Sequence, residues 1–418
     1  MLARTLYTLL LILAAPLLLF GLYRKRPNKP TFGSRWKEHF GWCPAYTGPT
    51  KPIWIHAVSV GECIAATPLI KAIKEKQPQQ AIIVTTTTST GAAQIAKLGE
   101  MVEHRYMPID FSCAVQSFIN KINPKQLLII ETELWPNTLN QVHKNNIPII
   151  VVNARLSEKS FHNYAMIKHL FSHMHCKISK ILCQTQADAE RFAQLGVDKD
   201  KLIITGSIKF DIKISKEIQQ QGKILRESIG PTRPVWIATS THAGEDEIML
   251  DSHKIILAHR KNALLIIVPR HPERFDQVAQ LCAKEDFIVE RRTKAVNIEP
   301  DTQIYLADTM GEMLTLLSTA DACFMGGSLL GHKVGGHNLL EPTAAGIASV
   351  TGPSYFNFQD ITESLLKHNL VTIASAPNKI ATSIEQLWQQ NPTKTKQRCE
   401  SFMSLYGGAI EKTLKLLE

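Results

Sequence analysis

The sequence lacks several patterns that mark common protein classes. Its eight cysteines include no Cys-x-x-Cys pair, so a disulfide framework or a zinc site is not expected and a reducing compartment is favoured. No Gly-x-x-x-x-Gly-Lys-Ser/Thr occurs, which excludes a P-loop nucleotide hydrolase, and no predicted strand is followed by a Gly-x-Gly-x-x-Gly dinucleotide fingerprint. No His, Cys and carboxylate cluster has metal-ligand spacing, so no metal or other cofactor is expected.

The chain is long and of ordinary globular composition. Its 418 residues are 44% hydrophobic and 20% charged, which predicts two folded domains rather than disorder. The net charge of +10 favours anionic partners, such as nucleic acid, a phosphorylated lipid or an acidic membrane face.

Residues 6–23 form a nearly continuous apolar run, close to the shortest length that spans a bilayer. A basic cluster follows at Arg24, Lys25, Arg26 and Lys29, whereas only Arg4 precedes it; a cleaved signal peptide has the opposite order. We therefore predict that residues 1–26 are a single-pass anchor with the rest of the chain in the cytoplasm. A monotopic hairpin or an interfacial helix is the alternative.

A first domain is predicted for residues 27–211, where apolar runs alternate with helical patterns. The runs lie at residues 52–57, 81–84, 127–130, 147–152, 181–183 and 202–204. Such alternation indicates an open parallel sheet, which binds ligands beyond the carboxyl ends of its strands.

Polar residues directly follow these strands. They are Glu62, Glu131 with Glu133, Asn153 to Arg155, and Lys209. Each has an ordinary explanation: Glu62 as a first-turn carboxylate, Glu131 and Glu133 as solvated loop charges, Lys209 as the partner of Asp211. Four such groups at one rim favour a ligand site.

A second domain is predicted for residues 233–418, after a polar linker at 212–232. Its strands are expected at 235–238, 264–268, 303–306, 321–325 and 349–351. Residues 239–247 resemble a helix N-cap followed by its first turn. The last amphipathic helix, at 409–417, either belongs to this domain or packs back on the first.

A glycine-rich stretch in the second domain predicts a nucleotide site. Gly326 and Gly327 follow a strand, and their backbone amides could face an anion, whereas Gly336 is expected to open a helix. Asn338 and Glu341 would share one face of its first turn, suited to ribose hydroxyls. Arg270 could bind phosphate, and a helix N-terminus is also expected at Gly311. A plain glycine-rich turn is the alternative.

Longer motifs resemble one family, the 3-deoxy-D-manno-octulosonic acid (Kdo) transferases of lipopolysaccharide synthesis. They occur, in order along the chain, at residues 56–62, 131–137, 153–157, 206–211, 236–242, 268–275, 308–312 and 336–338. The resemblance implies a GT-B fold: two facing Rossmann-like open parallel-sheet domains, α/β in class, with one N-terminal membrane-anchor helix.

The resemblance also implies substrates and residue roles. The donor would be CMP-Kdo and the acceptor the lipid A precursor, at the inner membrane, with no nucleic acid partner and no metal. Glu62 would be the general base, with Glu131 and Lys209 supporting the transition state. CMP would be held by Pro269, Arg270, Met310, Gly311, Glu312, Asn338, Leu339, Leu340 and Glu341.

Three other functions remain open from the sequence. A nucleotide-sugar epimerase and a lipid carrier-linked N-acetylglucosaminyl transferase share the architecture but would bind UDP. A membrane-anchored scaffold that kept the fold and lost activity would bind CMP without transferring sugar.

Overall fold

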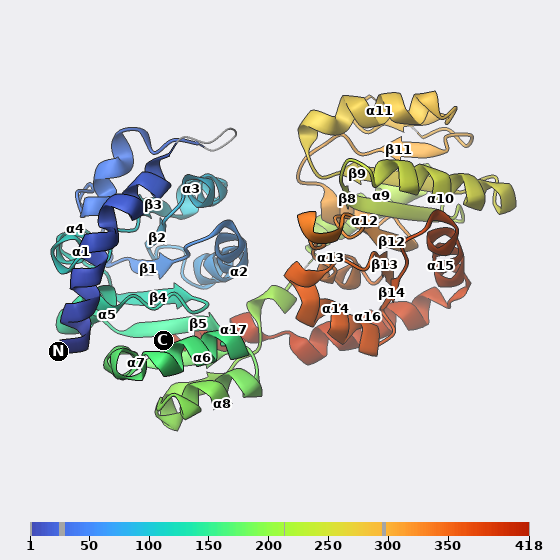
Figure 1. The fold of residues 1–418 in the computed structure, drawn as a ribbon. Coiled ribbons are helices and arrows are strands. Elements are labelled where there is room, and N and C mark those ends of the chain that lie inside the picture. The colour runs from blue at the N-terminus through green and yellow to red at the C-terminus, as the bar shows by residue number, and fades with distance from the viewer. Residues whose placement is uncertain (1, 25–29, 213, 295–297, 418) are drawn as a thin grey trace. The chain divides into compact units, whose positions relative to one another are not determined.

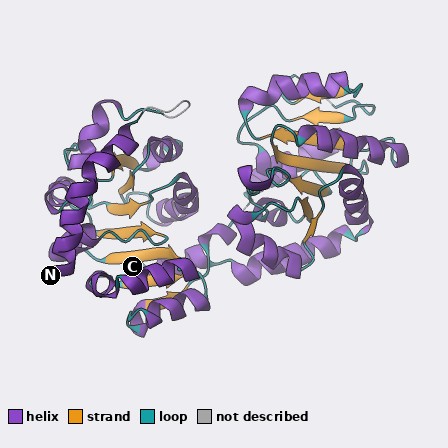
Figure 2. Cartoon of the chain, in the orientation of Figure 1, coloured by secondary structure: helices purple, strands orange, loops and turns teal. Residues whose placement is uncertain are grey.

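The computed structural model describes residues 2–24, 30–212, 214–294 and 298–417. They form two compact units, residues 1–211 with 406–418, and residues 212–405 (Figure 1). Each unit is a parallel sheet flanked by helices (Figure 2).

The first unit contains a seven-stranded parallel sheet in the order β3-β2-β1-β4-β5-β6-β7. Its strands are β1 (Ile53–His56), β2 (Ile82–Thr86), β3 (Glu103–Tyr106), β4 (Gln126–Ile130), β5 (Ile149–Ala154), β6 (Lys180–Cys183) and β7 (Leu202–Ile204). Ile55 lies beside Val84 on one side and Leu128 on the other. Because alternate residues face opposite sides of a strand, Ile55 and Trp54 belong to separate hydrophobic clusters, one on each face.

Eight helices after the N-terminal one belong to this unit in the part that the structure describes. They are α2 (Val60–Lys76), α3 (Ser89–Ala96), α4 (Ser112–Ile122), α5 (Pro136–Lys144), α6 (Glu158–Met166), α7 (Lys168–His175), α8 (Gln186–Gln194) and α17 (Ala409–Leu416). Short 3-10 turns are η1 (Gly33–Phe40), η2 (Gly99–Met101), η3 (Lys199–Lys201) and η4 (Ile208–Phe210).

The second unit has its own seven-stranded parallel sheet, in the order β10-β11-β9-β8-β12-β13-β14. Its strands are β8 (Val235–Thr241), β9 (Leu264–Pro269), β10 (Val289–Arg291), β11 (Ile304–Leu306), β12 (Ala322–Met325), β13 (Ser349–Thr351) and β14 (Val371–Ile373). Its α-helices are α9 (Lys216–Ile229), α10 (Asp246–His259), α11 (Phe275–Lys284), α12 (Met313–Leu317), α13 (Leu340–Ala344), α14 (Gln359–Lys367), α15 (Pro377–Gln389) and α16 (Pro392–Tyr406). The 3-10 turns are η5 (Pro272–Arg274), η6 (Gly331–Lys333) and η7 (Phe356–Phe358).

Three strands that the sequence did not predict, β3, β10 and β14, all lie at sheet edges. Their residues are only partly buried: Glu103 is exposed, Glu290 is half-buried, and Ile373 is 41% exposed. A strand covered on both faces is a continuous apolar run, whereas an edge strand is not. The interior strands follow the predicted apolar runs.

The segment expected as a linker, residues 212–232, contains α9. This helix packs against α12 so closely that a Cβ at Gly222 would lie 2.6 Å from the Ser318 Cβ. The last helix, α17, packs against α2 in the first unit, and the Asp211 carboxylate accepts hydrogen bonds from the Gly408 and Ile410 amides (both 2.5 Å).

The N-terminal helix α1 (Leu2–Tyr23) has 22 residues and is long and apolar enough to cross a membrane. One side contacts α5 and α7, and the Asn137 side-chain amide donates to the Thr8 hydroxyl at 3.0 Å. Its other side exposes leucines such as Leu13 and Leu17, 78% and 75% accessible. The predicted basic residues Lys25, Arg26 and Lys29 lie outside the described residues.

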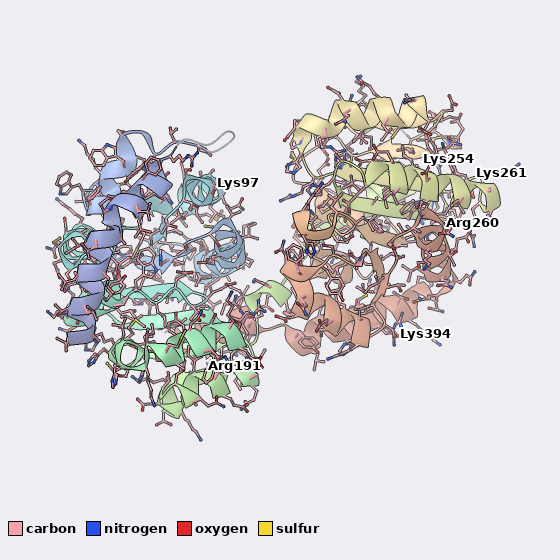
Figure 3. The ribbon with its side chains drawn as sticks, in the orientation of Figure 1. Lys97, Arg191, Lys254, Arg260, Lys261 and Lys394 are labelled. Atoms are coloured by element: carbon pink, nitrogen blue, oxygen red, sulfur yellow. The ribbon has the colours of Figure 1, made fainter. Side chains whose placement is uncertain are left out.

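The positive charge of the chain is not gathered on one element. The cations labelled in Figure 3 come from the ends or surfaces of α3, α8, α10 and α16. Some are already paired, as Lys254 is with Glu285 at 2.6 Å.

Candidate active site

Each sheet has a point at which the chain changes direction along the strand order. In the first unit β1 is followed by β2 on one side and joined by β4 on the other; in the second, β8 is flanked in the same way by β9 and β12. Loops after the two strands at such a point diverge and leave room for a ligand. The candidate residues gather at both points.

Glu62 lies in the first turn of α2, directly after β1. Its carboxylate accepts hydrogen bonds from the Val58 amide (2.7 Å) and the Ser59 hydroxyl (2.8 Å), and Ser59 in turn accepts from the Glu62 amide at 3.3 Å. Ser59 therefore caps the N-terminus of α2 through its side chain. Glu62 thus lies in the first turn of its helix, as its ordinary explanation requires, and three hydrogen bonds hold the residue in place.

The pKa of Glu62 is raised to about 7, first of all because the side chain is buried. The Val58 and Ser59 hydrogen bonds oppose the rise, whereas the negative charges of Glu133 and Glu131 add to it. A carboxyl group that titrates near neutral pH can take a proton from a hydroxyl and release it again.

Glu131 and Lys209 meet beside this carboxylate. Lys209 Nζ lies 3.0 Å from Glu131 Oε1, so the alternative in which Lys209 pairs with Asp211 is wrong; Asp211 binds α17 instead. Glu131 follows β4 with φ of +61°. A glutamate in this left-handed region is strained, and such strain concentrates at functional sites.

Asn153, in β5, also has a positive φ, +58°. Its side-chain oxygen accepts from the Ile208 amide at 3.1 Å, which fixes the short turn η4 that carries Lys209. The residue is fully buried. It positions Lys209 without facing solvent itself.

In the second unit, Arg270 follows β9 and is exposed, with its amide donating to the Thr241 carbonyl at 3.0 Å. Three histidines lie around it. His242 and His337 stack with their Nε2 atoms 2.9 Å apart, and the His242 ring meets His271 edge-on at 5.3 Å. Burial first, then the charge of Arg270, lowers the pKa of His337 to about 4. Arg270 is therefore the permanently charged group of this cluster, and it is suited to bind an anionic ligand.

The predicted role of the Gly326–Ser328 amides is wrong. Glu245, which is completely buried, accepts hydrogen bonds from the amides of Gly327 (2.7 Å), Ser328 (3.0 Å) and Leu329 (3.0 Å). The chain's own carboxylate thus occupies the place expected for a ligand anion. The glycines are needed because a Cβ at Gly326 would lie 2.7 Å from the Ser240 carbonyl oxygen.

Glu245 also accepts from the His242 amide at 3.0 Å, so one carboxylate ties the loop after β8 to the loop after β12. The sequence suggested only a first-turn helix carboxylate here, but α10 begins at Asp246. The neighbouring sequence gives no signal for this contact, because Glu245 and the Gly327 amide are 82 positions apart.

Asn338 and Glu341 do lie together, although the predicted helix start is wrong. Gly336 has a left-handed φ of +81°, and α13 begins at Leu340. The Asn338 side chain accepts from the Leu340 amide at 3.2 Å and donates to Glu341 at 3.5 Å. Burial raises the pKa of Glu341, while Asn338 and the charge of Arg270 act to lower it. The amide–carboxylate pair is thus next to Arg270.

The other predicted ligand residues differ in what they offer. The side chains of Pro269, Leu339 and Leu340 are buried in the core, so only their backbone atoms could face a ligand, whereas Met310 is 64% exposed.

Glu312 is paired with Arg292 through two hydrogen bonds of 2.8 and 3.3 Å, which lowers its pKa. The helix expected to open at Gly311 begins at Met313 and has five residues. Among the described residues, no group of three or more His, Cys, Asp or Glu side chains could hold a metal ion.

Solved structures share this fold at low sequence identity. The UDP-GlcNAc 2-epimerase from Neisseria meningitidis is 13% identical, covers 88% of this chain and 99% of that chain, and has a TM-score of 0.56. A glycosyltransferase from Rickettsia africae is 14% identical, with 88% and 98% coverage and a TM-score of 0.53. The chain therefore has the GT-B fold, with two seven-stranded parallel α/β domains.

The sequence relatives are more specific. A family model described as 3-deoxy-D-manno-octulosonic-acid transferase matches residues 34–212. The 3-deoxy-D-manno-octulosonic acid transferase of Haemophilus influenzae is 39% identical, covering 99% of this chain and 98% of that protein, and that of Bordetella pertussis is 30% identical with 99% of each covered. The chain belongs to the 3-deoxy-D-manno-octulosonic acid transferase family of enzymes.

Proposed function

We propose that the chain transfers Kdo from CMP-Kdo to a sugar hydroxyl of the lipid A precursor, with inversion at the anomeric carbon. The family, shared over the whole length with the Haemophilus influenzae protein, supports the transferred sugar. The observation that carries the mechanism is the buried Glu62 carboxyl group, whose pKa is about 7.

In this mechanism Glu62 is the general base. As the acceptor oxygen forms its bond to the anomeric carbon, the bond from that carbon to the CMP phosphate oxygen breaks, and the hydroxyl proton passes to Glu62. Attack from the side opposite CMP inverts the configuration. The transition state has oxocarbenium character, and the nearby Glu131–Lys209 pair, 3.0 Å apart, would hold the charges around it in place.

Donor binding is assigned to the second unit. Arg270 would neutralise the phosphate, whose charge grows as CMP leaves. Asn338 and Glu341, 3.5 Å apart, would hydrogen-bond the ribose hydroxyls, and backbone groups of Pro269, Gly311, Leu339 and Leu340 would complete the site with Met310 and Glu312. Since the Arg270 cation would stabilise the leaving group, we also propose that no metal is required. Addition of EDTA should then leave the rate unchanged.

The proposed location is the cytoplasmic face of the inner membrane. The apolar helix α1, 22 residues long, supports a membrane association that brings the chain to a lipid acceptor.

The decisive experiment is incubation of the full chain with CMP-Kdo and the tetraacylated lipid A precursor, followed by mass analysis of the product. A mass increase of one or more Kdo units is expected, together with thermal stabilisation by CMP and not by UDP. Stabilisation by UDP alone would contradict the proposal.

A further inference from the structure

An apolar groove runs beneath α1, between this helix and the body of the first unit. One cavity of about 310 Å³ is walled by Leu11, Ala15 and Leu18 of α1 and floored by Met107 and Ile109. A second, of about 490 Å³, continues it between the end of α1 and the aromatic side chains of η1, and the two share Leu19 and Leu22. Their volumes are in the usual range for ligand pockets, roughly 300–1,000 Å³.

The groove leads to the residues that hold Glu62. Thr87 and Trp135 line the first cavity. The Thr87 hydroxyl donates to the Val58 carbonyl at 3.2 Å, and the Val58 amide donates to Glu62 at 2.7 Å. The indole of Trp135 donates to Glu133 at 3.3 Å.

Three polar groups of the first cavity form hydrogen bonds with the protein itself, while Tyr7 and His39 also line this cavity and Tyr23 and Arg24 line the second. Besides Thr87 and Trp135, the wall contains Asp110, whose carboxylate accepts from the Asn137 amide (3.0 Å) and from the amide and hydroxyl of Thr138 (both 2.6 Å). These three groups therefore offer little to a peptide or a sugar, and most of the other residues that line the two cavities are apolar. An occupant without polar groups suits such a wall, because any unpaired polar atom buried there would be destabilising.

The outer side of α1 indicates where such an occupant comes from. Leu9, Leu13 and Leu17 are 54%, 78% and 75% exposed on it, and the helix is apolar enough to lie in a bilayer. A hydrocarbon chain that reached the groove from the bilayer would contact mainly apolar side chains of α1.

We propose that this groove binds one acyl chain of the glycolipid acceptor and thereby brings the acceptor's sugar to Glu62. The inference rests on the proposed function, since it concerns the same acceptor. The acyl chain would then be a second determinant of acceptor specificity, in addition to the sugar.

The test uses the full chain in nanodiscs and compares the acylated acceptor with its deacylated sugar. Ala15→Phe fills the groove, whereas Leu13→Phe adds an aromatic ring on the exposed side of the same helix. For Ala15→Phe, the ratio of kcat/KM for the acylated over the deacylated acceptor should fall about tenfold, as expected when roughly two fewer methylene groups are buried. Leu13→Phe should leave this ratio unchanged. An equal ratio in both variants would overturn the proposal.

A cross-linking measurement keeps the test independent of folding. An acceptor with a diazirine at the end of one acyl chain should label Leu11, Leu18 or Met107 of the unmodified protein. Labelling confined to Leu13 and Leu17, or labelling by a phospholipid probe that the acceptor does not displace, would contradict the proposal. If the unmodified protein transfers Kdo to neither acceptor, the proposed function itself fails; if it transfers Kdo but the groove is not labelled, only the present inference does.

Discussion

The two sheets place a glutamate at the same point, after the first strand of each unit, and use it differently. Glu62 follows β1, and its carboxylate accepts hydrogen bonds from the Val58 amide and the Ser59 hydroxyl. It belongs to no ion pair among the described residues, and burial raises its pKa to about 7. Glu245 follows β8 and accepts from four backbone amides.

The difference follows from how many donors reach each carboxylate. Four amides bind the Glu245 carboxylate and fix it to two loops, so this group is structural. Glu62 accepts fewer hydrogen bonds, and burial, together with the negative charges of Glu133 and Glu131, raises its pKa above the usual range of a carboxyl group. The comparison predicts that one glutamate controls the reaction rate and the other the stability of the second unit.

The largest effect on activity is expected at Glu62. Glu62→Gln should lower kcat by roughly 10²- to 10⁴-fold, the usual contribution of general acid–base catalysis, because the amide cannot accept the proton. Thermal stabilisation by CMP should stay unchanged. Glu75→Gln, an exposed change on the same helix, is the matched control. A Glu62→Gln enzyme of normal activity would remove the base from the proposed mechanism.

The next largest effect, on the affinity for CMP, is expected at Arg270. Arg270→Ala should weaken CMP binding by roughly 10- to 100-fold, since hydrogen bonds to charged groups are worth about 1.5–3 kcal/mol. Calorimetric titration with CMP measures this directly. Lys261→Ala, on the exposed loop before β9, should bind CMP normally. Equal affinities in the two variants would exclude Arg270 from the donor site.

Glu245→Gln should act on stability. The amide nitrogen would face backbone donors that the carboxylate now satisfies, so the free energy of unfolding of the second unit should fall by about 1–3 kcal/mol. Urea unfolding followed by tryptophan fluorescence, which includes Trp236 in β8, would detect it. Glu247→Gln, exposed in the first turn of α10, should change little. The comparison fails if Glu245→Gln is as stable as its control.

The smallest effect concerns the pH profile. Because the base must be ionised and its pKa is about 7, kcat/KM should fall as the pH drops below about 7. Glu133→Gln removes a negative charge that raises this pKa, so the acidic limb should move to lower pH. Glu158→Gln, on α6, should leave the limb in place, because Glu158 is not among the groups that shift Glu62. A limb that moves to higher pH, or that Glu62→Gln does not alter, would contradict this assignment.

The interior of the fold was predictable because both faces of its strands are covered. The predicted runs at 127–130 and 264–268 are apolar throughout, and every residue of β4 and β9 is buried. The edge strands β3, β10 and β14 were missed because half-exposed residues do not form such runs. Helix starts were predicted too early at Gly311 and Gly336, since glycines in loops there resemble helix openings.

The candidate site was predictable in its residues and less so in their contacts. Position after a strand was enough to select Glu62, Glu131 and Lys209, because topology brings such residues together. The Lys209–Glu131 pair joins residues 78 positions apart, which no local pattern predicts. The buried role of Glu245 depends on where the loop after β12 folds, and its neighbours in sequence do not specify that.

The last helix has a consequence for how the protein is made. Side chains of α17 cover a cluster that includes the buried face of α2, the helix of Glu62. A ribosome completes the first unit's sheet early but produces α17 only after the whole second unit. Until then α2 lacks part of its covering, so a truncation before Gly408 should lower the activity that depends on Glu62, although Glu62 lies near the opposite end of the chain.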